Sequence, residues 1–250
     1  MKLTLVGAGP GDPDLITVKG IRALQQADVV MYDALVHPEL LDHCRPDALK
    51  VYVGKRRGAY SCMQEDINPL IVHYARQYGH VVRLKGGDSF VFGRGYEEIE
   101  FARQHGIETA VVPGISSSYA VPAAAGIPLT TRGISESFWV VTGTTKAGQL
   151  SSDLQLAAQS SATVVVLMGM HKLAEIMGVF IGLGKDEVPV AIIQNGTLAD
   201  ERTVIGTVQT ICNRVDESGI GNPAIIVVGE VAQLGATDFV ALEKQHSANC

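Results

Sequence analysis

The chain has 250 residues, of which 46% are hydrophobic and 18% are charged, and it carries a formal net charge of -6. This composition is typical of a globular protein and excludes a disordered chain. The negative charge argues against general nucleic-acid binding, so any anionic ligand would need a local cluster of basic residues.

The first half of the chain alternates short apolar runs with helical patterns. The β-branched apolar runs predict strands, and the longer amphipathic runs predict helices between them. This alternation indicates a parallel sheet with helices on both faces, in which ligands bind at the carboxyl ends of the strands. The predicted strands are residues 2–6, 27–33, 50–53, 81–84 and 107–112. The predicted helices are residues 64–77 and 96–104, preceded by one that begins near Asp14 or Thr17 and runs to about Gln26.

The first strand ends in a glycine-rich loop, Gly7–Pro13. The loop is similar to the dinucleotide fingerprint G-x-G-x-x-G, but its third glycine comes one residue early and two prolines stiffen it. Asp33 ends the second strand about twenty residues later, where dinucleotide folds place an acid that binds a ribose hydroxyl. A helix cap is the other interpretation of Asp33. A nucleotide-binding oxidoreductase is therefore an alternative function.

A cationic run, Lys55, Arg56 and Arg57, follows the third strand between two glycines. Such a run is usually a solvated loop. At the ligand-binding edge of a parallel sheet, however, it would face an anion.

The stretch from Val81 to Glu98 holds the densest group of candidate site residues. Two glycines at the end of the strand allow the backbone to approach a ligand closely, and a carboxylate follows them. Two aromatic side chains then offer flat apolar surfaces, and an arginine precedes two glutamates at the start of the next helix. These residues are Gly86, Gly87, Asp88, Phe90, Phe92, Arg94, Glu97 and Glu98.

Residues 113–118 break the alternation and mark a boundary between two predicted domains, residues 1–113 and 114–236, with a predicted tail at 237–250. The small residues at 120–125 are expected to pack closely or to lie along a ligand. The second domain has predicted strands at 138–142, 163–168, 189–194 and 224–228, and predicted helices at 149–159, 171–182 and 207–217.

The cysteines and histidines show no metal-ligand pattern. The four cysteines lack a CxxC pair and the seven histidines lack an HExxH motif, so we predict no metal site. No apolar run is long enough to span a membrane, and no signal peptide is recognisable. We therefore expect a cytoplasmic protein with reduced thiols that binds neither a membrane nor a nucleic acid.

Several sequence blocks in order carry a family resemblance. They are residues 6–12, 30–33, 53–56, 83–95, 112–116, 126–130, 168–169 and 194–197. On these blocks the chain, from about Leu3 to Leu234, resembles the uroporphyrinogen-III C-methyltransferases of the tetrapyrrole methylase family.

The resemblance implies an α/β fold with two α/β domains of the class III methyltransferase type, a cofactor in the inter-domain cleft and a homodimer. The implied cofactor is S-adenosylmethionine, which leaves as S-adenosylhomocysteine. The implied substrate is uroporphyrinogen III, methylated at two pyrrole carbons, C2 and C7, to give precorrin-2 for sirohaem and cobalamin synthesis. A sibling precorrin methyltransferase that acts on a later corrin intermediate is the other possibility within the family.

The resemblance also assigns site residues. Asp33 and Arg94 are the candidates for acid-base work, but an arginine keeps its proton at neutral pH, so a substrate-orienting role for Arg94 is equally open. The implied catalytic residues are Asp33, Lys55, Arg94 and Glu97, and the implied substrate-binding residues are Lys55, Arg56, Arg94 and Arg132. The implied cofactor-binding residues are Pro10, Gly86, Gly87, Asp88, Val91, Ser116, Ser117, Met168, Gly196 and Ala224.

The chain departs from the family pattern at four positions. Ser89 replaces a common proline, Tyr96 a glycine, and Thr131 and Thr144 two histidines. The two threonines are expected to alter substrate contacts or rate. The extra dehydrogenase and ferrochelatase domain of fused sirohaem synthases is missing from the sequence, so the reaction is expected to stop at precorrin-2.

Overall fold

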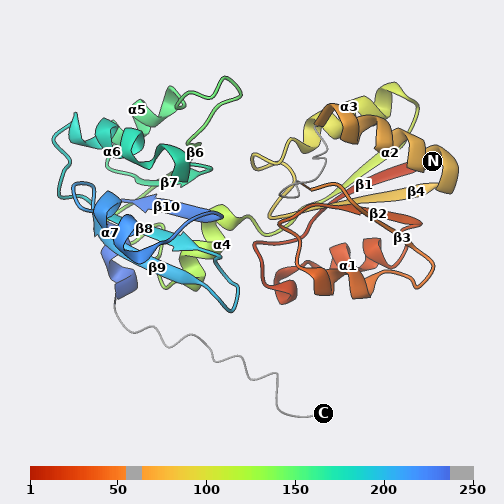
Figure 1. Cartoon of the computed structure of the whole chain (residues 1–250), viewed down its shortest axis with the longest axis horizontal. Coiled ribbons are helices and arrows are strands. Elements are labelled where there is room, and N and C mark those ends of the chain that lie inside the picture. The colour runs from red at the N-terminus through yellow and green to blue at the C-terminus, as the bar shows by residue number, and fades with distance from the viewer. Residues whose placement is uncertain (55–63, 237–250) are drawn as a thin grey trace, which may run out of the picture. The chain divides into compact units, whose positions relative to one another are not determined.

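A computed structural model describes residues 1–54 and 64–236 of the chain (Figure 1). The chain divides into two compact units, Met1–Ser117 and Ser118–Cys250. The unit boundary falls shortly after the domain boundary expected at residue 113. The cationic residues Lys55, Arg56 and Arg57 and the predicted tail lie outside the described residues.

Unit 1 contains a parallel sheet. Its strands are β1 (Lys2–Gly7), β2 (Val29–Tyr32), β3 (Leu49–Tyr52), β4 (His80–Lys85) and β5 (Glu108–Val112). Their order is β3-β2-β4-β1-β5, and every neighbouring pair is parallel, which confirms the sheet predicted for the first half. The order is wrong for a dinucleotide fold, because there β1 pairs directly with β2, whereas here β4 lies between them.

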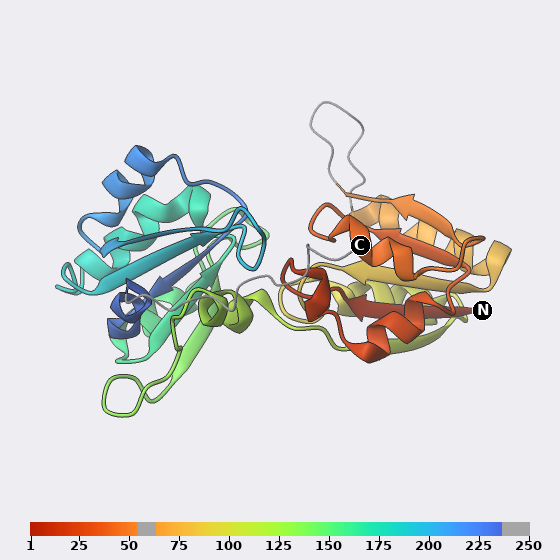
Figure 2. The ribbon, with the colours of Figure 1, turned by 90° about the horizontal axis from the view of Figure 1, so that it is seen from below.

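Helices cover both faces of this sheet. The α-helices are α1 (Val18–Leu24), α2 (Gln64–Tyr78) and α3 (Gly95–Gln104), and two short 3-10 helices are η1 (Pro13–Leu15) and η2 (Pro38–His43). α2 and α3 lie on one face and α1 on the other in Figure 1, and Figure 2 has α1 on the near side of the sheet. Of the two starts predicted for the first helix, Asp14 and Thr17, the second is confirmed, because Thr17 caps α1 by accepting a 3.0 Å hydrogen bond from the Gly20 amide.

Side chains along β4 alternate between the two faces. Val82 and Leu84 belong to the apolar cluster that includes Leu24 of α1. Val81 belongs to the cluster that includes Ile71 of α2 and Ile99 of α3. By the same alternation, Arg83 and Lys85 point toward the face that α2 and α3 cover.

Unit 2 contains a mixed sheet with the order β6-β7-β10-β8-β9. Its strands are β6 (Phe138–Thr142), β7 (Thr163–Leu167), β8 (Pro189–Gln194), β9 (Arg202–Thr207) and β10 (Ala224–Val228). β6 and β7 are parallel, whereas β10 is antiparallel to β7 and to β8, and β9 is antiparallel to β8. The strand β9 is missing from the sequence prediction, because its residues are exposed or half-buried and lack an apolar run.

The helices of unit 2 begin later than predicted. They are α4 (Ser117–Ala124), α5 (Asp153–Gln159), α6 (Leu173–Ile181) and α7 (Ile211–Ser218), with the 3-10 helices η3 (Met170–Lys172) and η4 (Glu230–Ala236). The prediction of a helix from residue 149 is wrong, because Gln149 closes a turn by accepting a 2.8 Å hydrogen bond from the Thr145 amide. The helix predicted from residue 207 begins at Ile211, since β9 extends to Thr207.

The sheet of unit 2 is also covered on both faces. Val164 and Val166 of β7 pack in the cluster that includes residues of α5, α6 and α7, while Val165 and Leu167 pack with residues of α4 and η4. Among the described residues, no helix combines the length and the apolar character needed to cross a bilayer.

Candidate functional site

The loops that follow β1, β2, β4 and β5 meet at one edge of the unit 1 sheet, because the strands are parallel. The loop after β1 and the loop after β4 are joined by two backbone hydrogen bonds. The Gly9 amide donates to the Gly87 carbonyl at 3.2 Å, and the Gly87 amide donates to the Gly9 carbonyl at 2.6 Å. The structure therefore brings Pro10 close to the predicted residues Gly86 and Gly87.

Glycines allow three of these loops to touch backbone to backbone. A Cβ atom on Gly7 would lie 2.5 Å from the Gly114 Cα atom and 2.7 Å from the Gly87 carbonyl oxygen. Gly87 itself has a φ of +65°, in the left-handed region, and a Cβ there would have the Ser117 amide nitrogen as its nearest neighbour at 3.8 Å. Gly87 and Ser117, both predicted to hold a cofactor, thus lie side by side, within ordinary van der Waals distance.

The Asp88 carboxylate holds this edge together. Its Oδ1 atom accepts a 2.8 Å hydrogen bond from the Phe90 amide, and its Oδ2 atom accepts a 2.9 Å hydrogen bond from the Gly114 amide. The loop after β4 is therefore tied to the loop after β5. Each carboxylate oxygen keeps further lone-pair directions, so Asp88 can still accept a hydrogen bond from a ligand.

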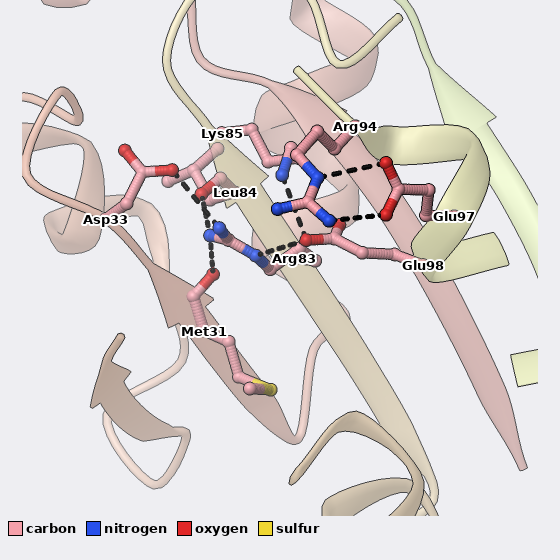
Figure 3. Close-up of polar contacts among 8 residues, drawn as sticks. All are labelled: Met31, Asp33, Arg83, Leu84, Lys85, Arg94, Glu97 and Glu98. Carbon is pink, nitrogen blue, oxygen red and sulfur yellow. Dashed lines mark hydrogen bonds and ion pairs between the residues drawn. The ribbon is translucent and has the colours of Figure 1, made fainter. Parts of the chain in front are cut away.

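Asp33 stands at the outer end of a charged network that is otherwise buried (Figure 3). Its Oδ2 atom lies 3.2 Å from Arg83 Nη2, and its Oδ1 atom accepts a 3.1 Å hydrogen bond from the Leu35 amide. Arg83 Nε lies 3.4 Å from Glu98 Oε1, and Lys85 Nζ lies 2.9 Å from the same oxygen. The network contains two cations and two carboxylates, which balances the buried charge.

The two-residue repeat of strand β4 and the helical repeat of α3 place these charged side chains together. Arg83 and Lys85 are two residues apart on β4 and therefore point to the same face. Glu98 lies on the buried stripe of α3 together with Ile99 and Ala102, so it faces β4. Burial lowers the pKa of Lys85 below its ordinary value, and the nearby Arg83 charge adds to this effect, while Glu98 opposes it.

Arg94 and Glu97 form an exposed pair at the start of α3. Arg94 donates to both Glu97 carboxylate oxygens, from Nε at 2.9 Å and from Nη2 at 2.6 Å. The hydrogen bonds that Arg94 donates to Glu97 raise the pKa of Arg94 above its ordinary value. Arg94 therefore stays protonated, which favours its orienting role over its role as a base. Around the pair, the loop exposes four apolar side chains, Phe90, Val91, Phe92 and Tyr96.

The predicted residues of unit 2 gather at one edge of its own sheet. Met168 follows β7 and Gly196 follows β8. Because β10 is antiparallel to both strands, its first residue, Ala224, lies at the same edge, opposite Gln194. Arg132 is exposed on a turn in which the Thr131 amide donates to the Ser135 carbonyl at 2.9 Å.

Non-glycine residues with positive φ occur only in these site loops within the described part of the chain. They are Phe92, Arg94, Met168, Asn195 and Thr197. Such conformations cost roughly 1–3 kcal/mol each and often mark ligand-binding loops. The strained backbone thus coincides with the edges that the sequence assigns to the site.

Comparison with known proteins gives the family. The sequence model of the Tetrapyrrole (Corrin/Porphyrin) Methylases matches residues 2–212. The chain belongs to this family. It is 46% identical over 235 residues to the uroporphyrinogen-III C-methyltransferase of Methanocaldococcus jannaschii, a match that covers 93% of the chain and 97% of that protein. It is 48% identical to the siroheme synthase of Chromobacterium violaceum over 92% of the chain, but it spans only 49% of that longer protein.

Solved structures of tetrapyrrole methylases have the same fold. The uroporphyrin-III C-methyltransferase of Thermus thermophilus complexed with S-adenyl homocysteine is 38% identical, with a TM-score of 0.80, and the match covers 94% of this chain and 100% of that one. The cobalt precorrin-4 methyltransferase is 30% identical, with a TM-score of 0.82, over 92% of this chain and 95% of that one. The predicted fold class, two α/β domains of the tetrapyrrole methylase type, is thereby confirmed.

Sequence reasoning missed Arg83 and Lys85 as site residues, and it included Glu98 among the candidates without predicting its buried partners. A signal was present, because the two cations alternate with apolar residues in a strand whose apolar residues are all buried. Buried cations are almost always paired, so the pattern indicates a nearby acid. Lys55 and Arg56 lie outside the described residues, and their predicted roles stay predictions.

Proposed function

We propose that this tetrapyrrole methylase transfers methyl groups from S-adenosylmethionine to C2 and C7 of uroporphyrinogen III and so produces precorrin-2. The near full-length match to the M. jannaschii uroporphyrinogen-III C-methyltransferase carries this proposal. We also propose that the protein works as a homodimer in the cytoplasm.

The edge of the unit 1 sheet fits the cofactor. Three of its loops meet through the glycines Gly7, Gly87 and Gly114, and glycine, which has no side chain, lets a ligand approach the main chain closely. We assign cofactor contacts here to Pro10, Gly86, Gly87, Asp88, Val91, Ser116 and Ser117. The family resemblance supports the same assignment for Met168, Gly196 and Ala224 of unit 2. When bound, the cofactor supplies a methyl group on a positively charged sulfur, which is already activated for transfer.

The substrate assignment rests on charge and shape. Uroporphyrinogen III carries carboxylates around its ring, and exposed arginines bind such groups through paired hydrogen bonds. Arg94 and Arg132 are suited to this task, and we propose Lys55 and Arg56 as further partners. The exposed Phe90 and Phe92 offer apolar surface to the flat pyrrole rings.

The reaction asks the protein for positioning and proton removal. The pyrrole carbons of a porphyrinogen are electron-rich, so the chain need not supply a nucleophile. Holding the carbon in line with the methyl group is a proximity effect, and a positioned base then takes the proton that the methylated ring loses. We propose Asp33 as this base. Its carboxylate is ionisable, partly exposed and fixed through both oxygens.

The test is incubation of the purified protein with uroporphyrinogen III and S-adenosylmethionine carrying a 13C-labelled methyl group. Two labelled methyl groups, at C2 and C7, are expected in the tetrapyrrole product. Label that enters only a later corrin substrate would favour the sibling precorrin methyltransferase. No labelled tetrapyrrole with either substrate would refute the proposal. Analytical ultracentrifugation of the same protein tests the homodimer, and a purely monomeric protein would refute it.

A further inference from the structure

We propose that Arg83 is a positioning residue that fixes the Asp33 carboxylate for proton removal. This inference rests on the proposed role of Asp33 in methyl transfer. It extends the site inward from the exposed edge to a buried arginine in the interior of unit 1.

Arg83 has little freedom to move, because its guanidinium group is bound on several sides (Figure 3). Nη1 donates to the Leu84 carbonyl at 2.9 Å and to the Met31 carbonyl at 3.4 Å, which anchors the group to β4 and to the neighbouring β2. Nε donates to Glu98 at 3.4 Å and Nη2 donates to Asp33 at 3.2 Å. The group therefore links the interior of the sheet directly to Asp33.

Asp33 is the one member of the network with a substantial exposed surface. Its side chain is 24% exposed, compared with 3% for Arg83. The Lys85 side chain is 7% exposed and that of Glu98 is fully buried. A substrate at the edge of the sheet would therefore meet the network at Asp33.

The contacts of Asp33 orient its carboxylate without using all of its acceptor capacity. Oδ1 accepts from the Leu35 amide and Oδ2 accepts from Arg83, so rotation of the carboxylate would break a contact. An ionised carboxylate offers about four lone-pair directions, and these two contacts leave the others for a substrate proton. Arg83 thus sets the direction in which Asp33 can accept that proton.

A role in stability alone would give a different set of mutant properties. If the network only attaches α3 to the sheet, changes at Arg83 and at Lys85 should lower stability alike and leave turnover untouched. If Arg83 positions Asp33, turnover should depend on Arg83 specifically. The two roles are separated first by a matched pair of variants that leaves no fully buried charge without a partner, because such a charge would destabilise the fold.

The matched pair of variants differs only at Arg83. The control, Lys85→Met with Glu98→Gln, removes one cation and one carboxylate and keeps the Arg83–Asp33 pair. The test variant adds Arg83→Met to the control. Its kcat for methyl transfer to uroporphyrinogen III should fall by on the order of 100-fold relative to the control. The KM for S-adenosylmethionine should stay within about threefold, because the cofactor loops are unchanged.

A second variant, Arg83→Lys, keeps a cation opposite Glu98 but lacks the guanidinium donors. It is measured alone and in combination with Asp33→Asn, with kcat expressed per S-adenosylhomocysteine-binding site so that any unfolded protein is excluded. Arg83→Lys should lower kcat in the wild type and have no further effect in the Asp33→Asn protein, since the carboxylate it positions is then gone.

Two results would overturn the inference while leaving the proposed function intact. One is an equal kcat for the control and the test variant. The other is the same fractional loss from Arg83→Lys with and without Asp33→Asn. Absence of methyl transfer by the wild-type protein would instead refute the proposed function, and the inference would fall with it.

Discussion

Replacing Gly87 by alanine separates the proposed cofactor role of this loop from its backbone geometry. The φ of Gly87 is +65°, and an added Cβ atom would lie 3.8 Å from the Ser117 amide nitrogen and 4.0 Å from its Oγ atom. These are ordinary van der Waals distances, so the new methyl group meets no steric clash within the described part of the protein. The cost in folding free energy is then the left-handed backbone alone, about 1–2 kcal/mol.

Gly106 provides a matched control in the same unit. Its φ is +74°, and a Cβ atom there would have no described neighbour within 4 Å. Gly106→Ala should therefore lower the free energy of unfolding by about the same 1–2 kcal/mol. Gly106 lies outside the proposed cofactor loops, so the affinity of the Gly106→Ala protein for S-adenosylhomocysteine should match that of the wild type.

Guanidinium denaturation measures the stability of both variants, and isothermal titration calorimetry with S-adenosylhomocysteine measures their affinity. Both variants should be destabilised alike, but only Gly87→Ala should lose affinity, by about tenfold or more, which corresponds to about 1.4 kcal/mol. The methyl group would occupy the space through which the ligand approaches the main chain. Equal affinities of the two variants would refute the placement of the cofactor beside Gly87.

Three further predictions concern stability, pH and turnover. The Oγ atom of the buried Ser89 has no hydrogen-bond partner among the described residues, so Ser89→Ala should raise the free energy of unfolding by about 1 kcal/mol. Ser135→Ala, which breaks three hydrogen bonds, should lower it. A lower free energy of unfolding for Ser89→Ala would contradict this. Folding lowers the pKa of Lys85 from its ordinary value of 10.5, so the unfolded chain binds more protons than the folded protein just below pH 10.5. The stability of the wild type relative to Lys85→Met should therefore rise with pH through that window. Chemical denaturation at several alkaline pH values measures this, and a stability difference between the two proteins that does not change with pH would contradict it. Arg94→Ala should keep S-adenosylhomocysteine binding and lose methyl transfer. Loss of the exposed ion pair with Glu97 should cost at most about 1 kcal/mol of stability. Lost cofactor binding with intact turnover would show that the role of Arg94 is misassigned.

The sequence predicts the parallel sheet of unit 1 because each of its strands contains an apolar or β-branched run between polar turns. The runs around Val29 and Val81 are buried on both faces and follow the expected pattern. Strand order is not encoded in such local runs. The position of β4 between β1 and β2, which rules out a dinucleotide fold, depends on how the whole unit packs.

Local patterns fail where the strands of unit 2 are half exposed or reversed. β9 lacks an apolar run because it forms the edge of its sheet, beyond β8. β10 has the expected apolar run, but nothing in that run shows that it is antiparallel to β7. That reversal is what brings Ala224 to the edge that also carries Met168.

The candidate site was predictable where function depends on the backbone and harder to predict where it depends on buried charge. Gly86 and Gly87 follow a strand, and that position alone indicates a close approach of the main chain. Arg83 pairs with Glu98 only because α3 packs on the sheet with Glu98 turned inward, a contact between elements that local sequence does not specify. The alternation of cations in β4 was the available signal for this pair.

The most direct test of the proposed activity is the number of methyl groups added to each tetrapyrrole. With uroporphyrinogen III and excess S-adenosylmethionine, mass spectrometry of the product should give a mass increase of two CH2 units per ring, because each added methyl group replaces a proton, with one S-adenosylhomocysteine released for each methyl group. A tetrapyrrole of unchanged mass, in the presence of protein that binds S-adenosylhomocysteine, would contradict the proposed function.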